Sequence, residues 1–482
     1  MIKILVLIFI LSTQSVFGTE DYEINKRGIV MLDLKNAIIT KLCKRGGGQG
    51  SDFPSIKMNL PSYKSDNGTG IEIHPEDVNK EQKWYWKTSK ALSRNASTCA
   101  YQFRNNKPLK SCDKIYNWID KVIINDKIKP HGVKSFPYYG NIKYDGSSFN
   151  FFYFIGMEIS NSYSIALQAL FPNNEDLKLE KIKQYDMWLG KRLDYYNEMY
   201  NLQVKQGKSR AQNHLVALEL ANMSLALLAN DKRRFKKSIE QWKTTLDSIN
   251  PDGSFPEEAI RGDWAINYTS KTITGLLRMV RIMKVQGYDL LSNDTYYKKY
   301  KKSIKFLTKS ISNNDNIFKY AKKNYRAYSK NYKEQDSSAL PKTLRLLVLN
   351  AFLQNNPNMY KNLLTLEIDK RACTVEKRKK IRGFGNEKNL CDKIEKPLSY
   401  SKIMNSIKYH QYLQPTWSGQ LCFYEFESKW EKNLIELKTN KLISSNQAPK
   451  TALQKAKSTC TDLGFTPKTE KHGDCVMKMI DR

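Results

Sequence analysis

The chain is poor in the residues that mark several common classes of protein. Its 482 residues include 23 Gly and 15 Pro, too few for a fibrous or linker-dominated protein. No apolar run after the N-terminus approaches the roughly 20 residues that span a bilayer. Only five histidines occur, and no HxH, HExxH or CxxC motif is present. These absences exclude a polytopic membrane protein and leave a metal or redox site without support.

Acidic residues are also scarce relative to basic ones. The chain has 48 Asp and Glu against 80 Lys and Arg, so its formal net charge is +32. Such an excess is typical of proteins with a polyanionic partner, either nucleic acid, anionic lipid or an acidic polysaccharide. An AT-rich genome is an equally good explanation, because it raises Lys, Asn, Ile and Tyr together and all four are abundant here. The charge alone therefore selects no partner.

The N-terminus resembles an export signal. Residues 1–18 contain one Lys, a short apolar core and a small-residue cleavage site, which predicts a secretory signal peptide cut before Thr19. We therefore expect a secreted or periplasmic bacterial protein. Export argues against nucleic acid as the partner of the basic charges.

The eight cysteines agree with an oxidising compartment, since an even number in an exported chain suggests disulfides. The connectivity does not follow from the sequence. Pairs that lie close together along the chain are the natural candidates, namely Cys99/Cys112, Cys373/Cys391 and Cys460/Cys475.

Hydrophobic residues make up 40% of the chain, enough for a large buried core. Apolar positions between about 81 and 352 recur with helical spacing, and the stretch 215–228 is apolar on more than one face, as expected of a helix packed on both sides. This pattern predicts a mainly α architecture with amphipathic outer and more apolar inner helices. After residue 370 the composition changes: the sequence becomes basic and is interrupted by glycines. We therefore predict a signal peptide over 1–18, a helical domain over 19–370 and a basic C-terminal extension over 371–482.

Two stretches concentrate polar residues within this apolar pattern. The pair Asn213-His214 opens the apolar helix, and the second stretch runs from Asp252-Gly253 to Tyr268. Arg261 and Tyr268 are separated by about two helical turns, so both are expected on one helix face. Glu258 precedes Arg261 by three residues and is expected to hold its guanidinium. Read singly, these are a core histidine, an N-cap, a surface ion pair and a half-buried aromatic ring.

The order and spacing of these residues resemble the alginate lyase family typified by poly(β-D-mannuronate) lyases (polysaccharide lyase family 5 and relatives). In that family an N-H pair begins an inner helix, and D-G-x-x-P-x-E and R-x6-Y follow. This chain has the same residue types in the same order, namely Asn213-His214, Asp252-Gly253, Pro256, Glu258, Arg261 and Tyr268. The resemblance covers roughly residues 30–350. It implies a mainly α fold, an incomplete α/α toroid (α/α barrel), here with a small Cys-containing C-terminal extension.

The resemblance also implies a reaction, β-elimination, in which the C5 proton of a uronate is removed and O4 leaves. Asn213 and Arg261 would neutralise the substrate carboxylate, one by hydrogen bonds and the other by bidentate charge. His214 would act as general base or add to this neutralisation. Tyr268 would protonate O4, and would also take the C5 proton where both lie on one face of the sugar, as in mannuronate. The reaction requires no metal and no cofactor.

The neighbours of these residues depart from the family pattern. The usual N-N-H-x-Y-W begins Gln212-Asn213-His214 but lacks the aromatic residues, and the usual Y-H-N-Y ends in Lys271. Near the N-terminus, Tyr63-Lys64-Ser65-Asp66 resembles the family's Y-x-x-S-D lid loop with one residue fewer; an exposed polar loop is an equally good interpretation. Tyr63, Lys64 and Gln212 are the predicted substrate-binding residues.

These expectations together predict a polysaccharide lyase that cleaves mannuronate-rich alginate and leaves unsaturated uronate ends. Its partner would be an anionic polysaccharide, with no nucleic acid, no membrane span and a monomer as the default state. Three alternatives remain: a lyase for another polyuronate such as glucuronan, a non-catalytic toroid that binds anionic polysaccharide, and a basic protein that binds anionic envelope polymers.

Overall fold

The protein was analysed as a computed structural model of the whole chain. It divides into two compact units, Met1–Glu425 and Phe426–Arg482. The structure describes residues 21–37, 52–53, 65–66, 70–71, 75–125, 156–205, 212–321, 335, 340–354, 356–364, 366–369, 460–461 and 469–480. The predicted signal peptide and the Cys373/Cys391 pair lie outside these residues.

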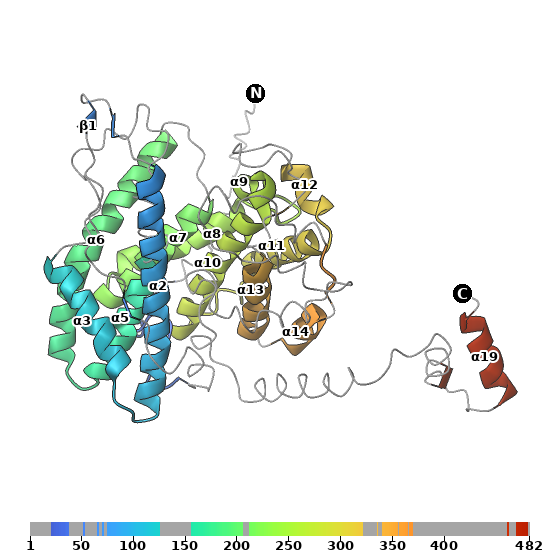
Figure 1. Cartoon of the computed structure of the whole chain (residues 1–482), viewed down its shortest axis with the longest axis horizontal. Helices are drawn as coiled ribbons and strands as arrows, with labels where there is room; N and C mark the ends of the chain where they lie inside the picture. Colours follow the sequence, from blue (N-terminus) through green and yellow to red (C-terminus); the bar gives the residue numbers. More distant parts are fainter. Residues whose placement is uncertain are drawn as a thin grey trace, which may run out of the picture. The chain divides into compact units, whose positions relative to one another are not determined.

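The described part of the chain is mainly helical, as predicted (Figure 1). Its single small sheet pairs β1 and β2 antiparallel, with Ser65 opposite Ile71. The bounds are β1 Ser65–Asp66, β2 Gly70–Ile71, α2 Pro75–Arg104, α3 Lys110–Asn125, α5 Met157–Leu170, α6 Glu175–Lys205, α7 Gln212–Ala229, α8 Lys232–Asp247, α9 Pro256–Ala259, α10 Ala265–Val285, α11 Asp294–Ser312, α12 Asp315–Ala321, α13 Leu340–Leu353, α14 Pro357–Leu364 and α19 Glu470–Ile480.

The helices of the first unit form two layers. In the inner layer, α5 packs on α7, α7 on α10 and α10 on α13. Each inner helix is followed along the chain by a helix of the outer layer, and α6, α8 and α11 cover α7 and α10. This succession of helical hairpins is the expected α/α toroid.

Burial explains which helices lie inside. Nearly every residue of α7 is buried, so this helix needs protein on all sides. By contrast, α8 buries a single stripe, Phe235, Ile239, Trp242 and Leu246, at positions i, i+4, i+7 and i+11. The other positions of α8 are mostly charged, which places it in the outer layer.

The N-terminal segment 21–37 crosses the C-terminal ends of the inner helices. Gly28 N donates to the Leu227 carbonyl of α7 at 2.9 Å, and an Arg281 terminal nitrogen of α10 donates to the Met31 carbonyl at 3.1 Å. Ser164 of α5 donates to the Gly28 carbonyl at 2.6 Å. The segment therefore closes this end of the inner layer and leaves the N-terminal ends of α7 and α10 at the opposite end.

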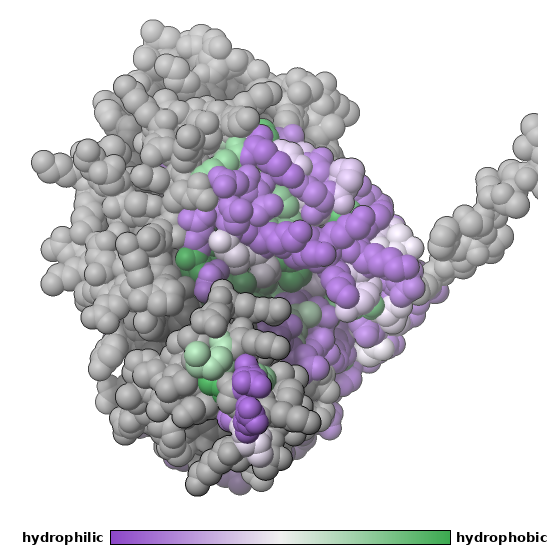
Figure 2. Space-filling view, turned by 90° about the vertical axis from the view of Figure 1, so that its right-hand side faces the viewer, coloured by the Kyte–Doolittle hydropathy of each residue, from purple (hydrophilic) through white to green (hydrophobic). Residues whose placement is uncertain are grey.

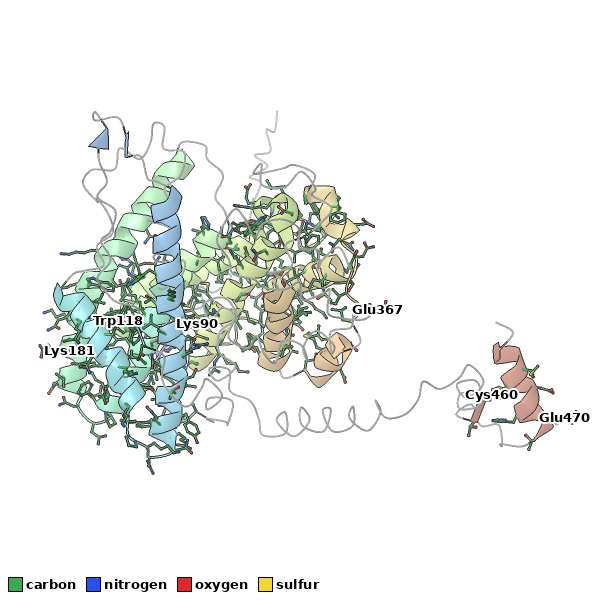
Figure 3. All side chains as sticks on the ribbon, viewed as in Figure 1. Lys90, Trp118, Lys181, Glu367, Cys460 and Glu470 are labelled. Atoms are coloured by element: carbon green, nitrogen blue, oxygen red, sulfur yellow. A yellow bond between two sulfur atoms is a disulfide. The ribbon has the colours of Figure 1, made fainter. Side chains whose placement is uncertain are left out.

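An ion pair is buried between inner helices. Arg278 of α10 lies 2.5 Å from Glu158 Oε1 of α5, and both side chains are at most 4% exposed. Burial raises the pKa of Glu158, and the charge of Arg278 only partly opposes this shift. On the outside, Lys181 of α6 pairs with Asp120 of α3 at 3.2 Å (Figure 3).

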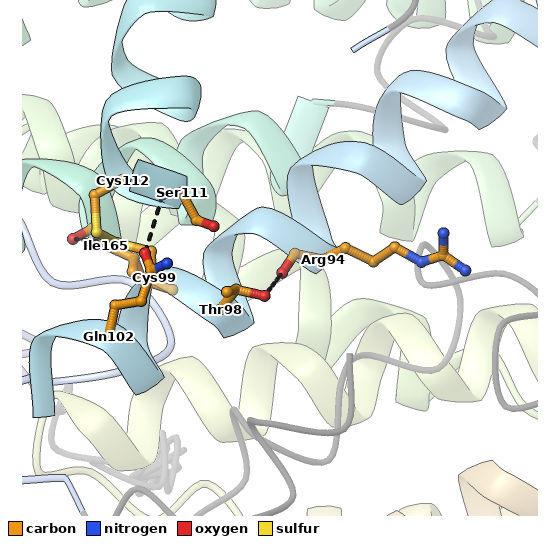
Figure 4. The surroundings of a disulfide bond; sticks show 7 residues. All are labelled: Arg94, Thr98, Cys99, Gln102, Ser111, Cys112 and Ile165. Carbon is orange, nitrogen blue, oxygen red and sulfur yellow. Dashed lines mark hydrogen bonds between the residues drawn. A yellow bond between two sulfur atoms is a disulfide. The ribbon is translucent and has the colours of Figure 1, made fainter. Parts of the chain in front are cut away.

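Two of the three candidate disulfides are present in the described residues. Cys99 of α2 and Cys112 of α3 close the turn between these helices, where Ser111 N also donates to Gln102 Oε1 at 3.0 Å (Figure 4). In the second unit, Cys460 is bonded to Cys475 of α19. Both pairings agree with the prediction from sequence proximity. Among the described helices, none is long and apolar enough to cross a membrane.

Candidate active site

The N-terminal end of α7 holds the predicted Asn-His pair. Asn213 is 1% exposed, and His214 is half-buried in the helix turn that follows. The rest of α7 is mostly apolar and buried, apart from Glu219, Asn222 and Ser224, so the Asn-His pair forms a polar start to a largely apolar helix. The predicted start of an inner helix at this pair is confirmed.

A tight turn brings the second stretch to the same place. Asp252 Oδ1 accepts from Ser254 N at 3.0 Å and Ser254 Oγ at 2.8 Å, and Asp252 Oδ2 accepts from Lys319 Nζ at 2.7 Å and Tyr320 OH at 2.9 Å. Burial would raise the pKa of Asp252, but these hydrogen bonds outweigh it and hold the pKa at about 2. Asp252 therefore fastens the turn to α12.

Gly253 is required at the centre of this turn. Its φ is +93°, and a Cβ there would lie 2.3 Å from the Lys302 carbonyl oxygen of α11. No side chain fits such an approach, and positive φ is itself unfavourable for other residues. The sequence pair Asp-Gly thus docks the turn against the outer helix.

Pro256 then occupies the first turn of α9, where its missing N–H costs nothing. Two residues later, Glu258 is fully buried, accepts from two N–H groups and pairs with a guanidinium. Its Oε1 accepts from Asn213 N at 2.7 Å, its Oε2 accepts from Asn213 Nδ2 at 2.7 Å, and Arg261 Nε lies 3.2 Å from Oε2. A buried carboxylate is tolerated only with such partners. Glu258 therefore ties the start of α7 to Arg261.

The prediction that Arg261 and Tyr268 lie on one face of a continuous helix is wrong. The chain leaves helical geometry at Arg261, forms a 3-10 turn at Gly262–Trp264 with Gly262 at φ +55°, and begins α10 only at Ala265. The two side chains still meet, because the Arg261 Cζ lies 4.6 Å from the Tyr268 ring centroid. A break in the helix, rather than two continuous turns, brings them together.

Gln335 supports this break from a distant part of the sequence. Its Oε1 accepts from Ile266 N at 3.1 Å, and its Nε2 donates to the Gly262 carbonyl at 3.0 Å. The side chain is 1% exposed. It therefore satisfies one backbone group at the first residue of the 3-10 turn and one at the start of α10. No local pattern around position 335 predicts this role.

The Arg261 side chain is held by its Nε. Besides the pairing with Glu258, Nε donates to the Glu257 carbonyl at 3.1 Å, and the residue is 8% exposed. These contacts fix the plane of the guanidinium at the edge of the site. A buried, oriented guanidinium is suited to bidentate binding of a carboxylate.

Tyr268 is surrounded by an aromatic ring and two cations. Trp264, one turn earlier, has its ring centroid 5.8 Å from that of Tyr268. The Nζ of Lys271, one turn later, lies 4.6 Å from the same centroid. Arg261 Cζ lies at the same distance from this centroid. Lys271 was not predicted as a functional residue; its position, where the family pattern has tyrosine, was the available signal.

The remaining predicted residues are placed as follows. Gln212 donates from Nε2 to Ser248 Oγ at 2.8 Å and accepts at Oε1 from Glu257 N at 3.3 Å, so its amide links α7 to the C-terminal end of α8 and to α9. Tyr63 and Lys64 lie outside the described residues. Within the described part of the chain, no group of three or more His, Cys, Asp or Glu side chains is arranged to hold a metal ion.

Comparison with known proteins places this site inside a family domain. Residues 153–317, which include Asn213, Glu258, Arg261 and Tyr268, match the family model described as alginate lyase. None of the curated proteins gives a match.

Several solved structures of alginate lyases show a weak structural similarity to this chain. Alginate lyase A1-III from Sphingomonas species A1 is 15% identical, with a TM-score of 0.44, and covers 73% of this chain and 94% of its own. Two variants of alginate lyase A1-III complexed with tetrasaccharide are 16% and 14% identical, with TM-scores of 0.46 and 0.47. The family assignment rests on the sequence match. Residues 153–317 therefore match the alginate lyase family model, in agreement with the predicted resemblance, and this match supports a polysaccharide lyase.

Proposed function

We propose that the protein is a secreted or periplasmic lyase that cleaves mannuronate-rich alginate by β-elimination and leaves unsaturated uronate ends. One observation carries this proposal above the others. The buried Glu258 fixes both Asn213 and Arg261, and Arg261 in turn packs on Tyr268. A carboxylate-binding pair is thus held beside a phenol, which are the groups that the reaction needs.

The first need of the reaction is to make the C5 proton acidic, because this proton lies next to a carboxylate and is barely acidic in water. In this proposal the Arg261 guanidinium binds that carboxylate and offsets the charge that develops when the proton leaves. Asn213 gives one Nδ2 hydrogen to Glu258 and has the second for the same substrate carboxylate. Its Oδ1 has no hydrogen-bond partner among the described residues and is suited to a sugar hydroxyl.

The second need is proton transfer on either side of the bond that breaks. The C5–H bond breaks as the proton passes to His214 or to Tyr268 in its phenolate form, and the electron pair is delocalised into the substrate carboxylate beside Arg261 and Asn213. The C4=C5 double bond forms as the C4–O4 bond breaks, and O4 leaves with the neighbouring sugar after taking a proton from Tyr268. When C5–H and O4 lie on one face of the sugar, as in mannuronate, Tyr268 alone serves both steps. This economy favours mannuronate over guluronate, in which C5–H and O4 lie on opposite faces of the sugar.

Export is part of the proposal. It rests on the apolar N-terminal segment of residues 1–18 and on the even number of cysteines. The Cys99–Cys112 and Cys460–Cys475 disulfides support an oxidising compartment, because such bonds are rare in the cytosol.

The test is an assay of the purified protein on polymannuronate, polyguluronate and glucuronan, followed by the ultraviolet absorbance of the new C4=C5 bond. We expect turnover of polymannuronate to be fastest. Replacing Tyr268→Phe removes the proton donor but retains the ring, so the rate should fall about 10²–10⁴-fold.

Tyr101→Phe is the matched control. Tyr101 is also a half-buried tyrosine with a lysine against its ring, since Lys107 Nζ lies 5.5 Å from the centroid, but it stands on α2 outside the site. Its variant should retain the full rate. An absence of absorbance on all three polymers would reject the lyase and favour the non-catalytic toroid, and fastest turnover of glucuronan would favour the other uronate.

A further inference from the structure

Lys271 is a second cation at the tyrosine of the proposed site. It follows Tyr268 by three residues on α10, a rise of about 4.5 Å, so both side chains lie on one face of the helix. Its Nζ is 4.6 Å from the Tyr268 ring centroid, and the residue is half-buried. The ammonium group of Lys271 therefore lies against the ring of the proposed proton donor.

Arg261 and Lys271 approach this ring from opposite directions along the chain. Arg261 precedes α10, whereas Lys271 lies within its second turn. Arg261 is tied by its Nε to the Glu258 carboxylate, a contact made from the side of α9. The Tyr268 ring therefore has two cations at the same distance, one held by the Glu258 carboxylate and one carried by α10 itself.

A polyuronate presents charges with the same arrangement. It has one carboxylate on each sugar, so every bridging oxygen has a carboxylate on either side. If Tyr268 protonates the bridging O4, the two carboxylates nearest to it belong to the sugar that loses its C5 proton and to the sugar that leaves with O4. Two cations at the ring of this tyrosine provide one partner for each of these carboxylates, whereas one cation would leave the second carboxylate unpaired.

We propose that Lys271 binds the carboxylate of the sugar that departs with O4, and so forms a second carboxylate subsite next to the one at Arg261. This inference rests on the proposed lyase function. It makes the enzyme selective for bonds between two uronates over bonds between a uronate and a neutral sugar. It also adds one ion pair to the salt dependence of substrate binding.

The test compares Lys271→Gln and Lys271→Arg with the unchanged protein on polymannuronate. We expect Lys271→Gln to raise KM about tenfold, as for the loss of one charge-assisted hydrogen bond, and to weaken the dependence of KM on salt. Lys271→Arg should restore most of the affinity, because it keeps the charge. The melting temperature of both variants should stay within a few degrees of the unchanged protein.

Lys301→Gln is the matched control, since Lys301 Nζ lies 5.8 Å from the ring of Tyr297 on the outer helix α11 and is exposed. It should leave KM unchanged. A second substrate isolates the subsite: a synthetic disaccharide in which mannose, with no carboxylate, is attached to O4 of mannuronate. On this substrate Lys271→Gln and the unchanged protein should have equal KM.

Binding to polymannuronate in gels, measured by affinity electrophoresis, separates this inference from the proposed function, because it needs no turnover. Equal retardation and equal KM for Lys271→Gln and the unchanged protein would overturn the subsite and leave the lyase intact. If neither protein shows turnover but Lys271→Gln is retarded less than the unchanged protein, the result would support the subsite and reject the lyase. An equal tenfold loss on the mannose-containing disaccharide would also overturn the inference, because the effect would then lie in the site as a whole.

Discussion

The outer and inner helices of the first unit use charge in opposite ways. The outer helix α11 has six lysines and one aspartate, and most of these lysines are exposed (Figure 2 shows one largely hydrophilic face of the unit). The inner layer has few charges, but Arg278 and the neighbouring Arg261 are each nearly buried and each paired with a buried glutamate. The net charge of +32 therefore describes the outer surface, whereas the chemistry that we propose depends on a few buried groups.

The buried Arg278–Glu158 pair offers the sharpest way to break this comparison. Arg278→Met leaves the Glu158 carboxylate buried without its cation, so we expect a loss of about 3–5 kcal/mol in the free energy of unfolding. Urea denaturation followed by circular dichroism measures it. The double variant Glu158→Leu with Arg278→Met removes both charges and should recover most of the loss; equal destabilisation by the double variant would show that packing, rather than charge, sets the cost.

Gly253 tests the contact between the site and the outer layer. Gly253→Ala would place a side chain at a positive φ and against the Lys302 carbonyl. We therefore expect the free energy of unfolding to fall by about 2 kcal/mol or more. Most of the activity should be lost as well, because the same turn leads to Glu258. Gly28→Ala is the control, since Gly28 has φ +78° but nothing within 4 Å of an added Cβ. It should cost about 1 kcal/mol, the conformational part alone. An equal cost at both positions would contradict the proposed close contact.

The lysines of α11 should give the smallest effect. Lys301→Gln with Lys305→Gln removes two exposed charges, and we expect the free energy of unfolding to change by less than about 0.5 kcal/mol per residue, because side chains in water gain little from ion pairs. Urea denaturation of the double variant checks this. A larger loss of free energy of unfolding would show that the exposed charges of the outer layer stabilise the fold. The contrast with the buried charges of the inner layer would then be wrong.

The layers themselves are predictable from the sequence because they depend on local periodicity. The apolar run of α7 and the i, i+4, i+7, i+11 stripe of α8 each indicate how many sides of the helix are covered. The Glu258–Arg261 pair is predictable for the same reason, since three residues separate its members. Its complete burial is not predictable, because it depends on the start of α7, which lies 45 residues earlier.

Most of the features that the sequence did not predict depend on long-range contacts. The interruption before α10 is supported by Gln335, which lies 69 residues after Ile266, and the Arg278–Glu158 pair joins residues 120 positions apart. No periodic pattern carries such information. Lys271 is a different case, because its position three residues after Tyr268 was visible, but only the structure places its ammonium group against the ring.

The closing segment at the N-terminus has a consequence for the kinetics of folding. Its hydrogen bonds from Asn25 to Gln286 and from Glu23 to Tyr288 join residues 261 and 265 positions apart, so they raise the contact order of the first unit. The first part of the described chain to be synthesised thus completes its contacts only after α10 has been made, although it also bonds to α5 and α7. The loop that must close is long, and its entropic cost falls on this last step. Completion of this end of the inner layer is therefore expected to be slow compared with formation of the individual helical hairpins, and a chain truncated before residue 286 would lose the contacts that Asn25 and Glu23 make.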